Sequence, residues 1–465
     1  MTSLPALGID LGLSGVRAAV VDRAGRLLGR GRVSAGGPPR AEGKAERDPR
    51  EWLEQAIAAA RQALAEAGCR GVAAIAIGAL GPCPVLLDRE LQPLAPAPLF
   101  SLDGRAEGHR QRLLATAGLD AERLGPDHAL PKLFWWKENA PALLRAAAWV
   151  VDAAGFLAAA FAGRPVMDRI TAEDYRLPAV EPPVPLPEPQ APDALAGPLT
   201  AAAAARLGIG AGAPVAVGSY DSFVDIAGTG TGASGEACVI LGSTMILGAV
   251  VDRPIARAGL RSSRHLGRGW FFGGWTSSAG SLLDWAQAQL GEAEGVEDLP
   301  PGAGGLLALP YFAGERAPVW DPAARGALVG LTLESSRAQI RRAMIDAVAL
   351  SALDLRRRMG EVAVRRWRLA GGGARSPALA QSVADAIGSA VELPAHAGEA
   401  LSPALLAFRA IGHRLDPPLE RRLEPDPARH RRYEALYGIY RGLYPALADS
   451  MHRLGRLAAS GEAAA

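Results

Sequence analysis

Residues 6–22 read ALGIDLGLSGVRAAVVD, and residues 237–251 read ACVILGSTMILGAVV. In both stretches an apolar run is followed by a short turn of small residues and then by a second apolar run. Apolar runs of this length, bounded by glycine and serine, are typical of buried strands joined by a tight turn. The sequence therefore predicts the same strand–turn–strand unit twice, once in each half of the chain.

The same further elements follow each unit. After the first unit, apolar residues at helical spacing between Pro49 and Gly68 predict a helix, and residues 72–77 predict a strand. After the second, residues 340–348 mark one face of a long helix, and residues 367–370 form a strand that ends in glycine. This repeated order, in 465 residues, predicts a duplicated α/β fold of two lobes, because one hydrophobic core rarely serves so long a chain.

We place the domain boundary in the small-residue stretch at residues 228–234. The predicted domains are an N-terminal lobe at 1–230 and a C-terminal lobe at 231–457, followed by a disordered tail at 458–465. A proline-rich stretch at residues 178–198 is predicted as an extended surface segment, and an ordered loop without a function is its preferred interpretation.

The composition excludes several classes of function. A net charge of +2, with acidic and basic residues mixed along the chain, gives no footprint for nucleic acid. Glycine and proline interrupt the longest apolar stretch, residues 72–87, so no membrane span is predicted, and the N-terminus lacks the pattern of a signal peptide. Three cysteines without a CxxC pair are typical of reduced thiols, so we expect a cytoplasmic protein.

The turn of the first unit contains Asp10, Gly12 and Ser14, with Arg17 close behind. Small residues leave backbone N–H groups open to phosphate oxygens, the serine adds a hydroxyl, and Asp10 is suited to hold a hydrated Mg²⁺. Alone, this pattern also fits an ordinary turn. The matching turn Gly242-Ser243-Thr244 favours phosphate binding, because two such turns, one per lobe, would hold a triphosphate in a cleft between the lobes.

A glycine-rich segment follows the last predicted strand. Glycine lets the chain approach a bulky ligand closely, and a nucleotide base with its ribose would fit there. A tight strand-to-helix turn is the alternative. The residues of this segment that we assign to the nucleotide are Gly371, Gly372, Gly373, Arg375 and Ser376.

Asp221 follows an apolar run and precedes the boundary stretch. An acid at the end of a buried strand near the junction of two lobes is placed to accept the proton of a substrate hydroxyl. Asp221 is therefore our candidate catalytic base, and a helix cap is the alternative. Asp103 and Arg105 are candidate hydrogen-bond partners for a polyol, and a surface turn explains them equally well.

Several common motifs are missing from the sequence. It contains no GxxxxGK[ST] phosphate loop, no GxGxxG fingerprint at the first strand, no GxSxG, no HExxH and no paired Cys/His pattern. A kinase with this sequence would therefore hold its phosphates in turns of the clamp type.

These patterns resemble the FGGY carbohydrate kinases over nearly the whole chain. The most specific match is LPYFAGERAPVWDP at residues 309–322, which is similar to the signature region of xylulokinase-like members. The resemblance implies the two-lobed, ribonuclease H-like fold shared by sugar kinases, chaperone ATPases and actin. It also implies ATP and Mg²⁺ as cofactors.

The resemblance further implies roles for individual residues. The two small-residue turns match the phosphate motifs of the family, the glycine-rich segment matches its adenosine motif, and Asp221 matches its catalytic aspartate. Asp103 and Arg105 match a segment near the sugar pocket of the family. Lys132 lies in a segment that matches a helix bordering the same pocket. Tyr220, next to Asp221, is then a candidate contact to the substrate.

Two departures from the family pattern bear on function. Leu13 replaces the threonine common in the first phosphate motif. The segment GALGPC at residues 78–83 replaces the Gly-Gln-Met-His-Gly sequence with which xylulokinases touch the sugar. Leu80 is left as the candidate substrate contact in this segment.

The predicted function is ATP-dependent phosphorylation of a primary hydroxyl of a small sugar, a ketopentose such as xylulose or a related ketose or polyol. The alternatives are a catalytically weak, sugar-sensing homologue and a sugar-independent ATPase of the same fold. We expect no nucleic-acid or membrane partner. The sequence names neither the sugar nor the oligomeric state, and it leaves a homodimer open.

Overall fold

The computed structural model describes residues 4–37, 40–41, 43–117, 124–125, 127–178, 180–395 and 401–459. The chain divides into two compact units: unit 1 is Met1–Gly230 with Glu399–Pro418, and unit 2 is Thr231–Gly398 with Leu419–Ala465. The segment Glu399–Pro418, which the predicted boundaries give to the C-terminal lobe, is thus part of unit 1. The predicted tail lies outside the described residues from residue 460 onward, and residues 458–459 end a helix.

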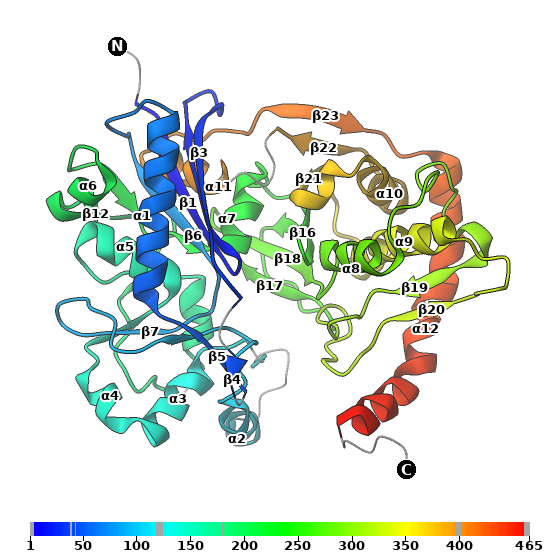
Figure 1. The fold of residues 1–465 in the computed structure, drawn as a ribbon, viewed down its shortest axis with the longest axis horizontal. Helices are drawn as coiled ribbons and strands as arrows, with labels where there is room; N and C mark the ends of the chain where they lie inside the picture. Colours follow the sequence, from blue (N-terminus) through cyan, green and yellow to red (C-terminus); the bar gives the residue numbers. More distant parts are fainter. Residues whose placement is uncertain are drawn as a thin grey trace. The chain divides into compact units, whose positions relative to one another are not determined.

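The sheet of unit 1 is mixed, in the order β12–β13–β6–β1–β2–β3, with β14 also paired to β6 (Figure 1). Because β1 runs antiparallel to β2 and parallel to β6, Asp10 lies opposite Arg17 on one side and opposite Gly78 on the other. The strand bounds are β1 Ala6–Gly12, β2 Gly15–Val21, β3 Leu27–Ser34, β6 Ile75–Ala79, β12 Leu195–Pro198, β13 Pro214–Ala216 and β14 Ser219–Tyr220. The predicted strand at residues 72–77 therefore begins three residues later than expected.

Smaller elements complete unit 1. The helices are α1 Pro49–Glu66, α2 Glu107–Ala117, α3 Leu130–Asn139, α4 Pro141–Ala146, α5 Ala153–Ala162, α6 Ala201–Leu207, α7 Asp221–Gly228 and α11 Leu401–Ala410. The short strands are β4 Arg40–Ala41, β5 Lys44–Arg47, β7 Val85–Leu87, β8 Ala97–Pro98, β9 Trp149–Val151, β10 Met167–Asp168 and β11 Pro189–Gln190.

Helix α1 begins where the sequence predicts it. The Asp48 side chain accepts a hydrogen bond from the N–H of Arg50, and proline occupies the first helical position, which suits a residue without an N–H. The apolar face of α1 packs on one face of the sheet, where Leu7 and Ile9 of β1 join the same core. The predicted helix is thereby confirmed.

Helix α11 packs on the opposite face of the sheet. A Cβ atom on Gly8 would collide with the backbone nitrogen of Ala404, so β1 and α11 meet backbone to backbone. Ala19 and Val21 of β2 pack against the same helix. Because successive residues of a strand point to opposite faces, Asp10 points to the same side as Gly8, toward α11.

Unit 2 repeats the strand order of unit 1. Its sheet runs β17–β18–β16–β15–β21–β22–β23, with β15 antiparallel to β16 and parallel to β21, as β1 is to β2 and β6. This match confirms the predicted duplicated α/β fold. The strands are β15 Glu236–Leu241, β16 Met245–Val251, β17 Arg261–Arg264, β18 Trp270–Trp275, β19 Leu307–Leu309, β20 Ala327–Val329, β21 Arg366–Ala370, β22 Val391–Pro394 and β23 Leu419–Leu423. The helices are α8 Gly280–Leu290, α9 Arg337–Arg358, α10 Pro377–Ile387 and α12 Pro427–Ala459.

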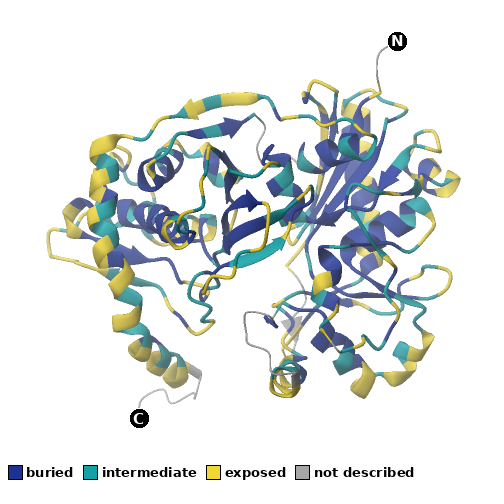
Figure 2. Cartoon of the chain, turned by 180° about the vertical axis from the view of Figure 1, so that it is seen from behind, coloured by how far each residue is buried: buried dark blue, intermediate teal, exposed yellow. Residues whose placement is uncertain are grey.

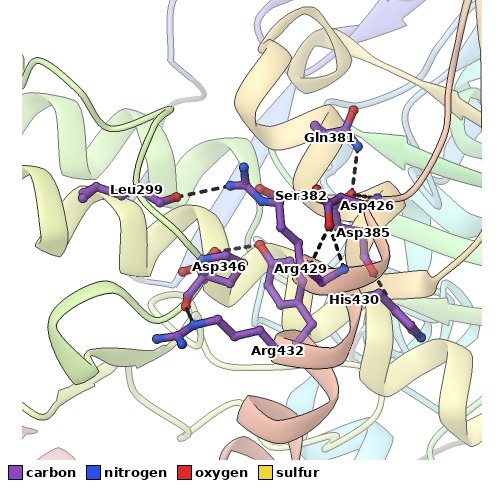
Figure 3. Close-up of polar contacts among 12 residues, drawn as sticks. Leu299, Asp346, Gln381, Ser382, Asp385, Asp426, Arg429, His430 and Arg432 are labelled. Carbon is purple, nitrogen blue, oxygen red and sulfur yellow. Dashed lines mark hydrogen bonds and ion pairs between the residues drawn. The ribbon is translucent and has the colours of Figure 1, made fainter.

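A buried polar network joins α9 and α10 to the C-terminal helix α12. Arg342 is fully buried, forms an ion pair with Asp346 at 2.7 Å, and donates hydrogen bonds to the hydroxyls of Ser382 and Tyr433, both at 2.9 Å. Figure 3 shows this region, with Asp346 and Ser382 close to the α12 side chains. Because a buried charge is costly unless it is paired and hydrogen-bonded, this network fixes α12 to unit 2.

The central strands of both sheets are buried, whereas edge strands such as β23 and the outer faces of the helices are largely exposed (Figure 2). Among the residues that the structure describes, no helix is both long and apolar enough to cross a membrane.

Candidate active site

Three aspartates gather at the end of the central strands of unit 1. Asp10 lies near the end of β1, and Asp221 begins α7 directly after β14. Since β14 and β1 both pair with β6, a Cβ atom on Gly78 of β6 would lie only 3.6 Å from the Cα atom of Asp221. Asp225, which the sequence analysis did not single out, follows four residues later and therefore lies on the same side of α7.

Burial raises the pKa values of all three carboxylates, and neighbouring carboxylate charges add to this for Asp221 and Asp225. Burial, followed by the charges of Asp10 and Asp225, raises the pKa of Asp221 to about 8. Burial and the charge of Asp10 raise the pKa of Asp225 to about 7, against a hydrogen bond from Ser402. Burial also raises the pKa of Asp10, although Arg17 pairs with it at 2.6 Å. A carboxylate whose pKa is raised toward neutral pH is suited to accept a proton there.

The same cluster bears on magnesium. Mg²⁺ in phosphate-transfer enzymes usually keeps several waters and is held by one or two carboxylates together with substrate phosphates. In the described part of the chain, no group of three or more His, Cys, Asp or Glu side chains is arranged to hold a metal ion by itself. The Asp10 carboxylate, adjacent to the first predicted phosphate turn, fits the water-mediated contact expected for it.

The first predicted phosphate turn is a two-residue hairpin between β1 and β2. Gly12 pairs with Gly15, and the intervening Leu13 and Ser14 are exposed. The hydroxyl of Ser14 donates to no described residue and remains open to a ligand. Leu80 donates its N–H to the carbonyl of Leu11 at 2.7 Å, which ties the end of β6 to this turn.

Unit 2 brings the two other predicted nucleotide motifs together. Gly242, Ser243 and Thr244 connect β15 to β16, and Gly371 follows β21, the parallel neighbour of β15. Gly371 has a φ of +90°, and a Cβ atom there would lie 2.5 Å from the carbonyl oxygen of Leu241. Glycine is therefore required where the chain turns beside the Gly242–Thr244 loop.

The rest of the glycine-rich segment divides into two parts. Gly372 and Arg375 are exposed, and together with Gly373 they lie in a single 3₁₀ turn. The Ser376 hydroxyl instead caps α10 by accepting a hydrogen bond from the N–H of Leu379 at 3.4 Å. Ser376 thus has a structural role, and its assignment to the nucleotide stays a prediction.

A hydroxyl-rich loop that the sequence analysis missed lies against the Gly242–Thr244 turn. It reads TSSAGS at residues 276–281 and leads from β18 into α8. The N–H of Gly280 donates to the carbonyl of Gly242 at 2.9 Å, and the Ser281 hydroxyl donates to the carbonyl of Ser243 at 2.8 Å. The loop and the turn are thus held together by hydrogen bonds. The run of small residues at 276–281 is the sequence feature that could have indicated this loop.

The signature segment at residues 309–322 supports that loop. Glu315 is buried and accepts hydrogen bonds from the N–H of Ser277 at 2.6 Å and of Arg316 at 2.8 Å. Burial raises the pKa of Glu315 to about 8. The Arg316 guanidinium donates to the carbonyl of Thr276 at 2.6 Å. The segment that carries the family resemblance therefore supports the loop beside the second predicted phosphate turn.

Asp103 and Arg105 lie together in unit 1 and are occupied by protein partners. The enclosed Asp103 carboxylate accepts hydrogen bonds from the N–H of Ala45 at 2.8 Å and from Nε and Nη2 of Arg105 at 2.8 and 2.6 Å. Arg105 also pairs with Glu46, and its guanidinium lies 5.1 Å from the ring centroid of Trp135. Most of the hydrogen-bonding capacity of this pair is used within unit 1.

Leu80 and Tyr220 lie beside Asp221 at the end of the sheet. Leu80 is part of the buried core of unit 1. The ring of Tyr220 occupies the space that a side chain at position 81 would need, because a Cβ atom on Gly81 would collide with it. The Tyr220 hydroxyl is enclosed and has no hydrogen-bond partner among the described residues.

Comparison with known proteins shows the family. The model of the N-terminal domain of the FGGY family of carbohydrate kinases matches residues 5–174, and the model of its C-terminal domain matches residues 237–411. The chain belongs to the FGGY family of carbohydrate kinases. It is therefore a sugar kinase, and its family uses ATP.

Relatives of this FGGY kinase differ in their named acceptors. Xylulose kinase of Bacillus subtilis is 26% identical over 488 residues, which cover 94% of this chain and 96% of that protein. Glycerol kinase of Alkalilimnicola ehrlichii is 33% identical over 224 residues, which cover 44% of this chain and 45% of that protein. The crystal structure of a xyloylose kinase from Brucella ovis matches with a TM-score of 0.84 at 25% identity, covering 96% of this chain and 99% of that one. These likenesses leave the acceptor open.

Proposed function

We propose that this FGGY kinase transfers the γ-phosphoryl group of ATP to a primary hydroxyl of a ketopentose such as xylulose, or of a related ketose or polyol. The observation that carries the proposal is the position of Asp221, which begins α7 beside Asp10 and has a pKa of about 8. Similarity to a xylulose kinase along nearly the whole chain supports a ketose as the acceptor.

In the proposed reaction Asp221 accepts the proton of the acceptor hydroxyl while the hydroxyl oxygen bonds to the γ-phosphorus. The bond from that phosphorus to the oxygen bridging to the β-phosphate breaks, and ADP leaves with the electron pair. Because the transition state of phosphoryl transfer is loose, Asp221 contributes more by orienting the hydroxyl than by deprotonating it. Mg²⁺ bound with the nucleotide, and held through water by Asp10, would offset charge on the phosphate oxygens.

We assign the nucleotide contacts to the small-residue turns. In unit 1, Ser14 and Arg17 stand at the turn next to Asp10, and their exposed donors suit phosphate oxygens. In unit 2, the hydroxyls of Ser243 and Thr244 donate to no described residue and are assigned to phosphates. Gly371, Gly372, Gly373 and Arg375 are assigned to the adenosine.

The end of β6 supplies few polar contacts to a sugar. Leu80 is buried in the core, and Gly81 accommodates the Tyr220 ring. Asp103 and Arg105 are largely satisfied by each other. The hydroxyl groups of the acceptor must therefore form at least part of their hydrogen bonds with other residues.

A coupled ADP-release assay tests the proposal. Wild-type protein is screened with MgATP against ketopentoses, ketohexoses, deoxyketoses, polyols and aldonates, and at least one acceptor is expected to release ADP. Asp221→Ala is expected to lower turnover with that acceptor by at least ~100-fold, because it removes the group that orients and deprotonates the hydroxyl, while MgATP still binds.

The control is Asp449→Ala, which changes an exposed carboxylate on α12 and is expected to leave turnover unchanged. Near-normal turnover by Asp221→Ala would contradict the assignment of the base. ADP release that does not depend on any acceptor would instead favour a sugar-independent ATPase.

A further inference from the structure

Lys132 carries a buried ammonium group that forms no ion pair among the described residues. It lies in the first turn of α3, and 2% of its surface is exposed. Its ammonium group makes no hydrogen bond and no ion pair within the described part of the chain. The Nζ atom is not completely enclosed and retains a small contact with solvent.

The charges that act on Lys132 are those of the Asp127 and Asp103 carboxylates and of Arg105, and neither carboxylate forms an ion pair with its ammonium group. The nearby Asp103 carboxylate already accepts hydrogen bonds from Ala45 and Arg105, and Arg105 itself adds positive charge. The thiol of Cys83 is held neutral, because burial raises its pKa well above the ordinary value. Burial accordingly lowers the pKa of Lys132. An unpaired ammonium in such a place costs free energy, which makes it a candidate for a functional contact.

A line of contacts connects Lys132 with the candidate base. The N–H of Cys83 donates to Asp152 at 2.8 Å, and a Cβ atom on Gly81 would lie 2.8 Å from the other oxygen of that carboxylate. Gly81 also supports the ring of Tyr220, which directly precedes Asp221. The Cys83 thiol lies within the electrostatic influence of both Lys132 and Asp221.

We propose that Lys132 is a substrate-binding residue whose ammonium donates a hydrogen bond to an oxygen atom of the acceptor, at the end remote from the hydroxyl that faces Asp221. This inference rests on the proposed function and adds the polar contact that the end of β6 does not supply. The oxygen belongs either to a hydroxyl or carbonyl group of a ketose or polyol, or to the carboxylate of an aldonate. A charge-assisted hydrogen bond would compensate the buried charge in both cases.

Lys132→Met tests the inference, because methionine keeps much of the length and apolar volume of the lysine and removes its charge. With the best acceptor of the ADP-release screen, kcat/KM is expected to fall by at least ~30-fold, as for the loss of a hydrogen bond to a charged group. The KM for MgATP is expected to stay unchanged. The melting temperature is expected to be equal or higher, because an unpaired buried charge has been removed.

Binding gives a readout that does not depend on turnover. Without nucleotide, the acceptor is expected to raise the melting temperature of wild-type protein and of Lys137→Met, but not of Lys132→Met. Lys137 is the matched control, because it is an exposed lysine on the same helix. A neutral acceptor and an aldonate of equal carbon number separate the two oxygen sources. If wild-type protein prefers the aldonate and Lys132→Met does not, the oxygen belongs to the carboxylate. If Lys132→Met instead loses binding of the neutral acceptor, the oxygen belongs to a hydroxyl or carbonyl group.

Two results would overturn the inference while leaving the proposed function intact. One is a kcat/KM for Lys132→Met within ~2-fold of wild type for every active acceptor, since that is below the effect of one neutral hydrogen bond. The other is failure of Lys132→Met to fold where Lys132→Arg folds, which would give the ammonium a structural role. If wild-type protein releases ADP with no acceptor, the proposed function fails and this inference falls with it.

Discussion

Asp225 stands one helical turn after Asp221 and adds a negative charge beside this proposed base, which must lose its proton to work. The base is active as the carboxylate, so kcat/KM is expected to rise with pH through the pKa of Asp221, which is about 8. Asp225→Asn removes a like charge, and the carboxylate of Asp221 then becomes easier to form. The acid limb of the pH profile is therefore expected to move to lower pH.

The measurement is kcat/KM for the acceptor between pH 5.5 and about 9, the range in which the two shifted carboxylates titrate. Asp449→Asn, at an exposed carboxylate of α12, is the control and should leave the profile in place. An unchanged acid limb in Asp225→Asn would show that Asp225 does not act through Asp221.

Sequence patterns pointed to some residues of the candidate site and could not point to others. Asp10 and Asp221 were predictable because each ends an apolar run, where a strand delivers its last residues to the edge of a sheet. Asp225 sits inside the helical stretch SFVDIAG and looks like any polar residue on a helix. The significance of Lys132 depends on the absence of a partner in space, and no spacing along the chain reports that.

At the scale of elements, the contact between β1 and α11 depends on Gly8. A methyl group at this position would collide with the backbone of Ala404, and backbone atoms cannot move aside as a flexible side chain can. Gly8→Ala is therefore expected to lower the free energy of unfolding by about 1–3 kcal/mol, the usual cost of overpacking a core. Urea denaturation followed by circular dichroism measures the change.

Gly108→Ala is the matched control for this prediction. It lies in α2, and no atom comes within 4 Å of the position that its Cβ would take. Alanine is favoured over glycine in a helix by about 1 kcal/mol, so this variant should be as stable as wild type or more stable. Equal stability of Gly8→Ala and wild type would mean that α11 does not press on β1.

Local sequence signals predicted the helices and strands well. They could not predict which helix packs on which sheet. Helix α1 carries its own cap at Asp48, and β16 coincides with an unbroken apolar run, so both followed from neighbouring residues. Helix α11 is recognisable as apolar, but its sequence does not state which sheet it covers. That choice depends on the fit of Ala404 to Gly8, two positions nearly 400 residues apart.

At the scale of the whole molecule, unit 1 is assembled from two separate segments of the chain. A fragment of residues 1–230 lacks α11, so Gly8, Ala19 and Val21 lose their cover on one face of the sheet. We expect this fragment to bind the dye ANS and to unfold with low cooperativity. A chain in which residues 1–230 continue through a flexible linker into residues 399–418 is expected to unfold cooperatively without binding the dye.

Fluorescence of ANS and urea titration of both chains check this prediction. Cooperative unfolding of the shorter fragment would show that α11 is dispensable for unit 1. The duplicated fold itself was predictable, because the strand–turn–strand pattern occurs twice. The assignment of residues 399–418 to unit 1 was not predictable, since no change in composition marks this segment.

The late position of α11 has a consequence for synthesis on the ribosome. The strands of unit 1 leave the ribosome early, but the helix that covers one face of their sheet follows only after the intervening residues 231–398. At ordinary elongation rates that interval lasts on the order of ten seconds or more. During translation the nascent sheet therefore presents an uncovered apolar face, at which chaperones of the cell would engage the chain before it can close.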